Sequence, residues 1–151
     1  MEEIVDIVTR GGQSTCGTEV VYRIGVNKTV IQVRELEPAT SRFIEVAEFD
    51  PASEETPEAY TRVTGEADTR YRVAMAEGTT SWQVVTALNA MSSLSGPVSD
   101  IPAEGSLAPD SYEFKPGATV ASILERMETA QDRILAEAWA ERAADLPIST
   151  P

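Results

Sequence analysis

The sequence contains no histidine and only one cysteine, Cys16, among its 151 residues. The missing imidazole excludes Ser-His-Asp and Cys-His catalysis, most zinc sites and any pH switch based on histidine. A single cysteine cannot form a disulfide within the chain. Long hydrophobic runs are missing as well, because no stretch approaches the roughly 18 apolar residues of a membrane-spanning helix. These absences exclude classes of function without selecting one.

Basic residues are scarce relative to acidic ones. The sequence has 12 Lys and Arg against 25 Asp and Glu, which gives a net charge of −13. Such a surface repels phosphate, so nucleic acid and anionic membrane surfaces are poor partners, and a neutral or cationic ligand is easier to accommodate. Apolar residues make up 42% of the sequence and charged residues 25%, as is typical of a folded globular protein.

The first half of the chain is predicted to be rich in strands. The stretches TEVVYRIGV, TVIQVREL and RFIEVAEFD alternate in polarity and are rich in β-branched residues. We expect an antiparallel meander over residues 18–49, with Asn27-Lys28 as a two-residue turn. Ahead of it, MEEIVDIVTRGG has the apolar spacing of one helix face and ends at two glycines, which predicts the end of a helix over residues 1–12.

An acidic, proline-bearing connector follows over residues 51–69. One short helix is predicted within it, around Glu58 to Val63. The acidic run is interpreted as a solvated surface, because its spacing matches no EF-hand loop. No metal site is predicted.

The second half contains two similar units. RYRVAMAEG predicts a strand that leads to Gly78, followed by a helix whose start carries a capping box of Thr80 and Gln83. SYEFKPG leads to Gly117 in the same way, and a long helix follows that Pro147 is expected to end. A threonine stands two residues after each glycine. We interpret this as a repeated strand–Gly–helix unit, in which glycine supplies the positive φ for a steep exit from the strand.

The second unit also carries longer motifs. EGSLAPDSYEFKPGATVASILERM, continued by AEAWAERAADLP, contains the phrases G-x-L-x-P-D-x-Y-x-F-x-x-G and W-x-x-R-x-x-x-L-P. With these motifs, residues 70–151 resemble the YceG/MltG-type endolytic murein transglycosylases. Two departures are mild: Ala76 replaces the proline of the family's Pro-Glu-Gly, and Ser111 replaces the threonine of its Pro-Asp-Thr-Tyr.

Pattern and resemblance together predict an α+β fold, with an antiparallel strand meander, LysM-like strand–Gly–helix units and a long C-terminal helix. Residues 1–12 would be the tail end of a truncated LysM-like helix. Residues 13–69 would be a strand-rich insertion with an acidic connector. Residues 70–151 would be the LysM-like region and the start of the catalytic region.

The resemblance implies a periplasmic protein held on the bacterial inner membrane by one N-terminal helix, a segment that we expect to be absent from this chain. Its partners would be the glycan strands of nascent peptidoglycan, with cell-wall synthesis proteins as further candidates. Members of this family cleave those strands without hydrolysis. A single glutamate acts as acid and then as base, while the sugar's own 6-hydroxyl closes a 1,6-anhydro ring. No cofactor is implied.

The catalytic glutamate of the family belongs to an A-S-I-x-E-K-E-T phrase, which this sequence does not contain. We therefore expect no catalytic residue in this chain and no activity from the chain alone. The motifs transfer three candidate substrate-binding residues. Asp110 could bind sugar hydroxyls or cap the turn after Pro109, and Tyr112 could stack on a sugar or lie in the core. Glu77 could line the groove or favour the positive N-terminus of the next helix.

The two tryptophans, Trp82 and Trp139, fall at helical spacing with other apolar residues and are predicted to be core rather than glycan platforms. A second function also fits the sequence: a non-catalytic, LysM-like glycan-binding or interaction module.

Members of the family have also been labelled aminodeoxychorismate lyases. That chemistry in its usual form needs a lysine bound to pyridoxal phosphate. The only lysines are Lys28 at the expected turn and Lys115 between Phe114 and Pro116, and neither is placed as a buried nucleophile. We therefore reject this activity on physical grounds.

Overall fold

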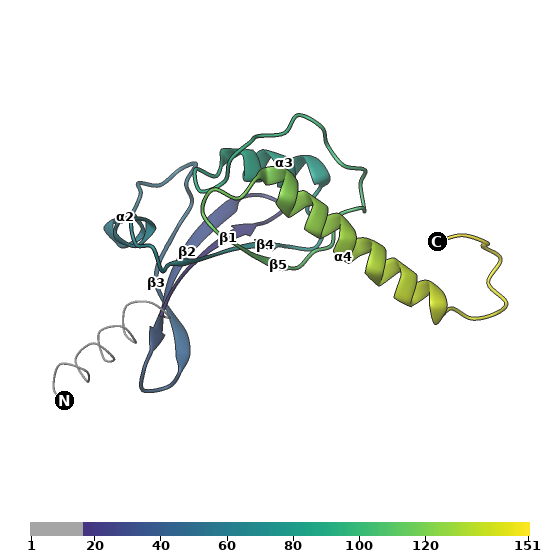
Figure 1. Ribbon diagram of the computed structural model, residues 1–151, viewed down its shortest axis with the longest axis horizontal. Coiled ribbons are helices and arrows are strands. Elements are labelled where there is room, and N and C mark those ends of the chain that lie inside the picture. Colours follow the sequence, from purple (N-terminus) through teal and green to yellow (C-terminus); the bar gives the residue numbers. More distant parts are fainter. Residues whose placement is uncertain (1–16) are drawn as a thin grey trace.

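The computed structural model describes residues 17–151 of the chain (Figure 1). The helix expected over residues 1–12 lies outside this range. The described residues form five strands and three helices, and their order and bounds are as follows: β1 (Thr18–Ile24), β2 (Thr29–Glu37), β3 (Arg42–Phe49), α2 (Glu58–Thr64), β4 (Arg70–Met75), α3 (Ser81–Ala90), β5 (Ser111–Phe114) and α4 (Val120–Ala140). The predicted α+β class is confirmed, as is the short helix in the acidic connector.

The five strands form one mixed sheet in the order β3-β2-β1-β4-β5. Neighbours β1, β2 and β3 are antiparallel, which confirms the predicted meander over residues 18–49. On its other side β1 pairs with β4 in parallel, with Tyr22 opposite Val73. β5 then pairs antiparallel with β4. A parallel neighbour requires a crossover, and the chain crosses back to β1 through the connector that contains α2. The meander and the strand–Gly–helix region therefore share one sheet.

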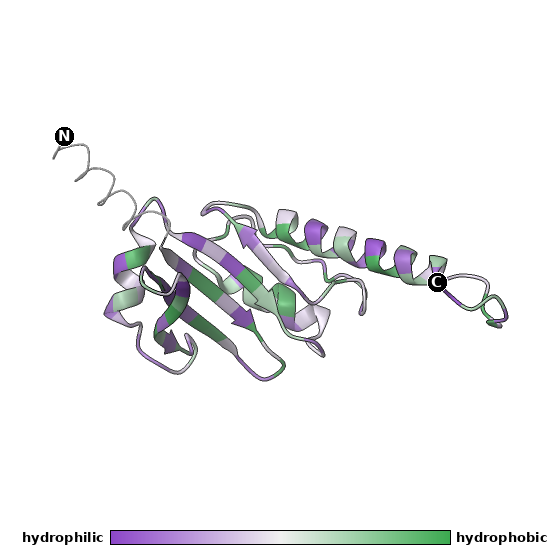
Figure 2. Ribbon diagram, turned by 90° about the horizontal axis from the view of Figure 1, so that it is seen from below, coloured by the Kyte–Doolittle hydropathy of each residue, from purple (hydrophilic) through white to green (hydrophobic). Residues whose placement is uncertain are grey.

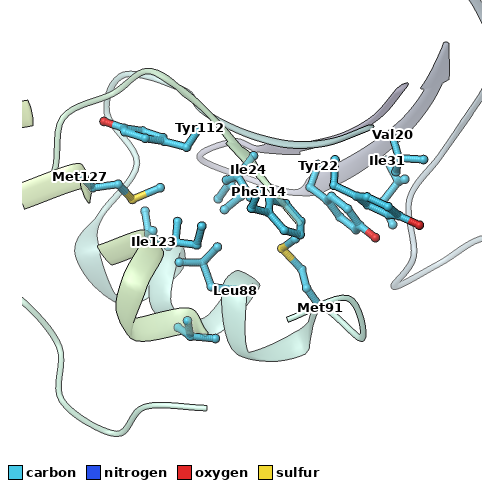
Figure 3. Packing of buried hydrophobic residues seen from close by; sticks show 14 of the residues in the cluster. Val20, Tyr22, Ile24, Ile31, Leu88, Met91, Tyr112, Phe114, Ile123 and Met127 are labelled. Atoms are coloured by element: carbon cyan, nitrogen blue, oxygen red, sulfur yellow. The ribbon is translucent and has the colours of Figure 1, made fainter. Parts of the chain in front are cut away.

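One face of this sheet carries the hydrophobic core and is covered by α3 and α4 (Figures 1 and 3). Polarity alternates along the strands, so each strand turns apolar residues to this face (Figure 2). The main members of the core are Val20, Tyr22, Ile24, Ile31, Val33, Tyr71, Val73, Tyr112 and Phe114 from the strands, and Val84, Val85, Leu88, Val120, Ile123, Leu124 and Met127 from the helices. Each such side chain contributes about 1.5–3 kcal/mol when fully buried.

The opposite face of the sheet carries a polar network. Glu19 is buried, with its carboxylate 3.2 Å from Arg72 and 4.0 Å from Arg34. Gln32 is also buried and donates to the carboxylate of Glu48 at 2.6 Å. The burial of these polar groups is offset by their hydrogen bonds and ion pairs.

Both predicted strand–Gly–helix junctions are confirmed. Gly78 follows β4 with a φ of +81°, and Gly117 follows β5 with a φ of +85°. This left-handed conformation is open to glycine at little steric cost. Thr80 then caps α3 in a capping box with Gln83. Thr119 caps α4, because its side chain accepts a hydrogen bond from the Ser122 amide in the first turn of the helix. The same local chemistry therefore starts both helices.

The turn between β1 and β2 is displaced by one residue from its expected position. Ile24 pairs with Thr29, and the Gly25 amide donates to the Lys28 carbonyl at 3.0 Å, so Val26 and Asn27 form the two-residue turn. The prediction of Asn27-Lys28 is wrong, since the observed register pairs Tyr22 with Ile31 and Ile24 with Thr29.

The long helix α4 packs on the sheet only with its first half, and the rest projects away from the domain (Figure 1). In the projecting half, Ile134 is 45% exposed. The helix ends at Ala140 rather than at Pro147. Near this end the Arg142 guanidinium donates to the Trp139 carbonyl at 2.7 Å and lies 4.0 Å from the indole ring. Trp139 was expected in the core, but it is only partly buried and lies outside the buried cluster.

Candidate functional site

A groove of about 660 Å³ lies between α3, the β1–β2 turn and the segment that follows β3. The core face of the sheet contributes Tyr22, Ile24 and Ile31 to its wall, and Met91 contributes from the end of α3. We call it the Trp82 groove, after the tryptophan of α3 that lies among its lining residues. Its volume is within the range of small-molecule binding sites, and its mostly apolar wall with a few polar groups is typical of them.

Aromatic side chains build the wall of the groove opposite α3. Phe49 and Tyr60 pack edge to face with ring centroids 5.2 Å apart. The Tyr60 hydroxyl shares a hydrogen bond of 2.9 Å with the Tyr22 hydroxyl, which also accepts one from Ser93 at 3.2 Å. Burial raises the pKa of Tyr22 far above its ordinary value, although the hydrogen bond from Ser93 acts in the opposite direction. Tyr22 is therefore a neutral, fixed part of the wall.

Trp82 is 59% exposed, so the prediction that it is a core residue is wrong. The helix turns Val84, Val85 and Leu88 toward the sheet, which leaves the indole at the side of the buried stripe. One turn further along α3, Thr86 is also exposed and lines the groove. The helix thus presents an aromatic ring and a hydroxyl on the same side.

Gln83 holds one edge of the Trp82 groove in place. Its side-chain amide donates to the Val26 carbonyl in the β1–β2 turn at 2.6 Å, while its oxygen accepts from the Thr80 backbone at 2.8 Å. The start of α3 is thereby joined to the turn of the meander. Within the described part of the chain, the side chains of Thr86 and Asn27, which also line the groove, make no hydrogen bond.

The Trp82 groove is close to electrically neutral. Its charged lining residues are Lys28 and Asp50, which have opposite signs. Asp50 also accepts a hydrogen bond from the Ala52 backbone at 2.9 Å. In a chain with a net charge of −13, this balance favours an uncharged ligand over an anion.

Asp110 and Tyr112, two of the predicted site residues, lie at the start of β5. Tyr112 is 6% exposed, and its hydroxyl donates to the Ala108 carbonyl at 2.8 Å. The Arg126 guanidinium lies 5.7 Å from its ring centre. Burial raises the pKa of Tyr112, and the nearby charge of Asp110 adds to this shift. Asp110 is exposed and accepts a hydrogen bond from the Ser111 backbone at 2.7 Å. In this arrangement Tyr112 packs in the core and Asp110 closes the turn.

Glu77, the third predicted site residue, is exposed in the turn before Gly78. The Met75 amide donates to the Asp110 carbonyl at 3.0 Å, so the structure brings the two turns that carry Glu77 and Asp110 side by side. Neither residue lines the Trp82 groove.

Glu104, which no feature of the sequence distinguishes, has a defined structural role. Both of its carboxylate oxygens lie 3.1 Å from the Ser81 amide, at the N-terminus of α3. The Ser81 hydroxyl donates in turn to the Ala103 carbonyl at 3.1 Å. A carboxylate at this position stabilises the helix through its positive N-terminal end. The long loop between α3 and β5 is thereby attached to the helix.

With one exception, the acidic side chains among residues 17–151 are partly or fully exposed. Glu19 is the only buried acidic side chain among residues 17–151, and it is paired with two arginines. A second cavity of about 320 Å³ lies beside Arg23 and Glu48. Glu19 lines neither this cavity nor the Trp82 groove. Within the same range there is no cluster of three acidic or cysteine side chains that could hold a metal ion. Both lysines are exposed.

The helices of the described region are all too short or too polar to cross a membrane.

Comparison with known proteins gives one match. The model of a family described as the YceG-like family matches residues 20–151, a range that includes the strand-rich first half as well as the two strand–Gly–helix units. No curated protein and no solved structure matches the chain.

Proposed function

Because this chain belongs to the YceG-like family, we propose that it is part of an endolytic murein transglycosylase, which cleaves nascent peptidoglycan glycan strands and leaves 1,6-anhydro ends. The observation that carries this proposal is the family match over residues 20–151. In the reaction, one carboxyl group protonates the glycosidic oxygen, and the resulting carboxylate removes the proton of the 6-hydroxyl as that oxygen closes the ring.

The role of this chain in the proposed enzyme is to hold the glycan. The catalytic glutamate would belong to a part of the protein outside these 151 residues. The environment of Glu19 supports this division, because a carboxylate paired with Arg72 on the sheet face away from the groove cannot reach a bound sugar. The chain alone is then inactive.

The proposed enzyme acts on the periplasmic side of the bacterial inner membrane, to which a segment outside this chain would anchor it. Its proposed partners are peptidoglycan glycan strands, with proteins of cell-wall synthesis as further candidates. The net charge of −13 supports the exclusion of nucleic acid as a partner.

The reaction class is tested with the full-length protein that contains this chain. Purified sacculi are incubated with it in water enriched in heavy oxygen, and the soluble products are analysed by mass spectrometry. We expect 1,6-anhydro ends and no heavy oxygen in the new termini, because the 6-hydroxyl rather than water attacks. Reducing ends that carry heavy oxygen would identify a hydrolase and refute the proposal.

One observation favours a second candidate, a non-catalytic glycan-binding or interaction module. The described residues form a ligand-sized groove, and its one acidic lining residue, Asp50, already accepts a hydrogen bond from the Ala52 backbone. Full-length protein that sediments with sacculi and releases no product would favour this candidate over the transglycosylase.

A further inference from the structure

The Trp82 groove combines three features that together indicate a ligand. An indole that is 59% exposed stands at its side, although tryptophan is among the costliest side chains to leave in water. The groove beside it reaches down to the core, with the buried residues Ile24 and Ile31 at its wall. Two exposed polar side chains, Thr86 and Asn27, also line it and are open to the polar groups of a ligand.

The groove is formed before any ligand arrives. The Gln83 side chain fixes the β1–β2 turn to α3, and the hydrogen bond between Tyr22 and Tyr60 fixes α2 to the sheet. The edge-to-face contact of Phe49 with Tyr60 adds a rigid aromatic corner. A preformed site loses less entropy on binding than one that must be assembled.

The lining defines the chemistry of the ligand. An anion is disfavoured by the net charge of the chain, and Lys28 and Asp50 cancel one another at the groove. A purely apolar ligand would leave the hydroxyl of Thr86 and the amide of Asn27 unpaired. A pyranose meets both demands, because its C–H face can pack on the Trp82 ring while its hydroxyl groups bind these two side chains. An acetamido substituent would in addition place a methyl group against the apolar wall.

We propose that the Trp82 groove is a binding subsite for an uncharged, N-acetylated sugar of a glycan strand. The substrate class rests on the proposed function, whereas the position of the subsite rests on the groove itself. The subsite lies between α3 and the strand-rich first half of the chain. The turn that carries Glu77 adjoins it, because the Ala76 amide donates to the carbonyl of the lining residue Ile24 at 2.9 Å.

The two tryptophans allow a direct test with the 151-residue chain. Trp139→Phe leaves Trp82 as the only indole, and titration with chitotetraose, an uncharged oligomer of N-acetylglucosamine, should shift its emission to shorter wavelength and saturate. Calorimetry then compares two variants. Trp82→Ala should bind at least tenfold more weakly than wild type, while the matched control Trp139→Ala, altered on the projecting half of α4, should bind within twofold of wild type.

A second variant tests the polar side of the subsite. Thr86→Val keeps the shape of the side chain but removes the hydroxyl, and it should weaken binding severalfold without changing the melting temperature. Cellotetraose, which lacks the acetamido groups, should bind at least fivefold more weakly than chitotetraose to the wild-type chain.

The outcomes separate the two proposals. Chitotetraose binding that is equal in Trp82→Ala and wild type, or absent altogether, would overturn the subsite even if full-length protein cleaves sacculi. Self-association of the chain that is lost in Trp82→Ala, seen by sedimentation velocity, would assign the groove to a second copy and also overturn the subsite. Binding that depends on Trp82, in a protein that does not cleave sacculi, would support the subsite and refute the transglycosylase.

Discussion

Replacing Gly117 with alanine should destabilise the protein by about 1–2 kcal/mol, the usual cost of holding an L-residue in the left-handed conformation. Gly117 has a φ of +85°, and a Cβ added there would have no heavy atom within 4 Å. Its amide donates to the Ser93 carbonyl at 2.9 Å, a bond that alanine keeps. The whole effect would therefore come from backbone conformation, at the junction where β5 gives way to α4.

Gly65 provides the matched control. It follows α2 with a φ of −86°, in the right-handed region, and an added Cβ would lie 3.7 Å from the Arg62 carbonyl oxygen, an ordinary contact. Gly65→Ala should stabilise the protein by about 0.4–1 kcal/mol, because alanine restricts the unfolded chain.

Urea unfolding followed by circular dichroism measures both variants. The denaturant slope should stay equal to that of wild type, so that the shift in midpoint reports stability directly. For Gly117→Ala we expect the melting temperature to fall by roughly 2–8 °C. Equal stability of Gly117→Ala and wild type, or a larger loss in Gly65→Ala, would refute the assignment of a conformational role to the glycine between strand and helix.

Three further predictions concern buried or capping groups. Tyr112→Phe should lower the free energy of unfolding by about 1 kcal/mol, because it removes the hydrogen bond to Ala108. Tyr112→Ala should lower it by about 3–5 kcal/mol, because it leaves a cavity. Urea unfolding measures both, and a Tyr112→Ala protein as stable as wild type would contradict the core position of this ring. The free energy of unfolding should fall as the pH rises above about 10, because Tyr22 then ionises in the unfolded chain, while its raised pKa keeps it protonated in the folded one. Tyr22→Phe should flatten this fall. An unchanged pH profile in Tyr22→Phe would count against the buried, neutral state of Tyr22. Glu104→Ala should cost about 1 kcal/mol and Glu104→Gln less, because glutamine still accepts from the Ser81 amide; equal stabilities of wild type and Glu104→Ala by thermal unfolding would exclude the capping role.

Local patterns in the sequence were sufficient to predict most of the individual elements. Alternating β-branched residues predict the three strands of the meander, and the pair Thr80 and Gln83 predicts the start of α3. The glycines at both junctions are predictable because left-handed backbone favours this residue type. These features depend on neighbours within a few residues, which a single sequence contains.

The joining of the two halves could not be predicted in this way. The parallel pairing of β1 with β4 places Tyr22 beside Val73, residues far apart along the chain, and no local signal encodes that contact. The Trp82 groove lies between the same two halves, so its wall of Phe49 and Tyr60 could not be predicted from the sequence either. Glu104 was missed for a similar reason, since its partner Ser81 lies across a long loop.

The exposed position of Trp82 could have been predicted from the angular spacing of residues around the helix. At about 100° per residue, Val84, Val85 and Met91 all lie within about 60° of Leu88 around the helix. Trp82 lies roughly 120° from Leu88. The buried stripe of α3 is centred on Leu88, so this arithmetic places the indole outside the stripe. The wrong prediction came from helical spacing with other apolar residues, without locating the centre of the buried stripe.

In the proposed enzyme, these 151 residues bind glycan strands and the catalytic acid belongs to another part of the protein. Mass spectrometry of the soluble fraction from sacculi, incubated in parallel with the chain alone and with full-length protein at equal concentration, tests this most directly. We expect 1,6-anhydro products from the full-length protein and none from the chain. Release of anhydro products by the chain alone would contradict the proposed division of roles.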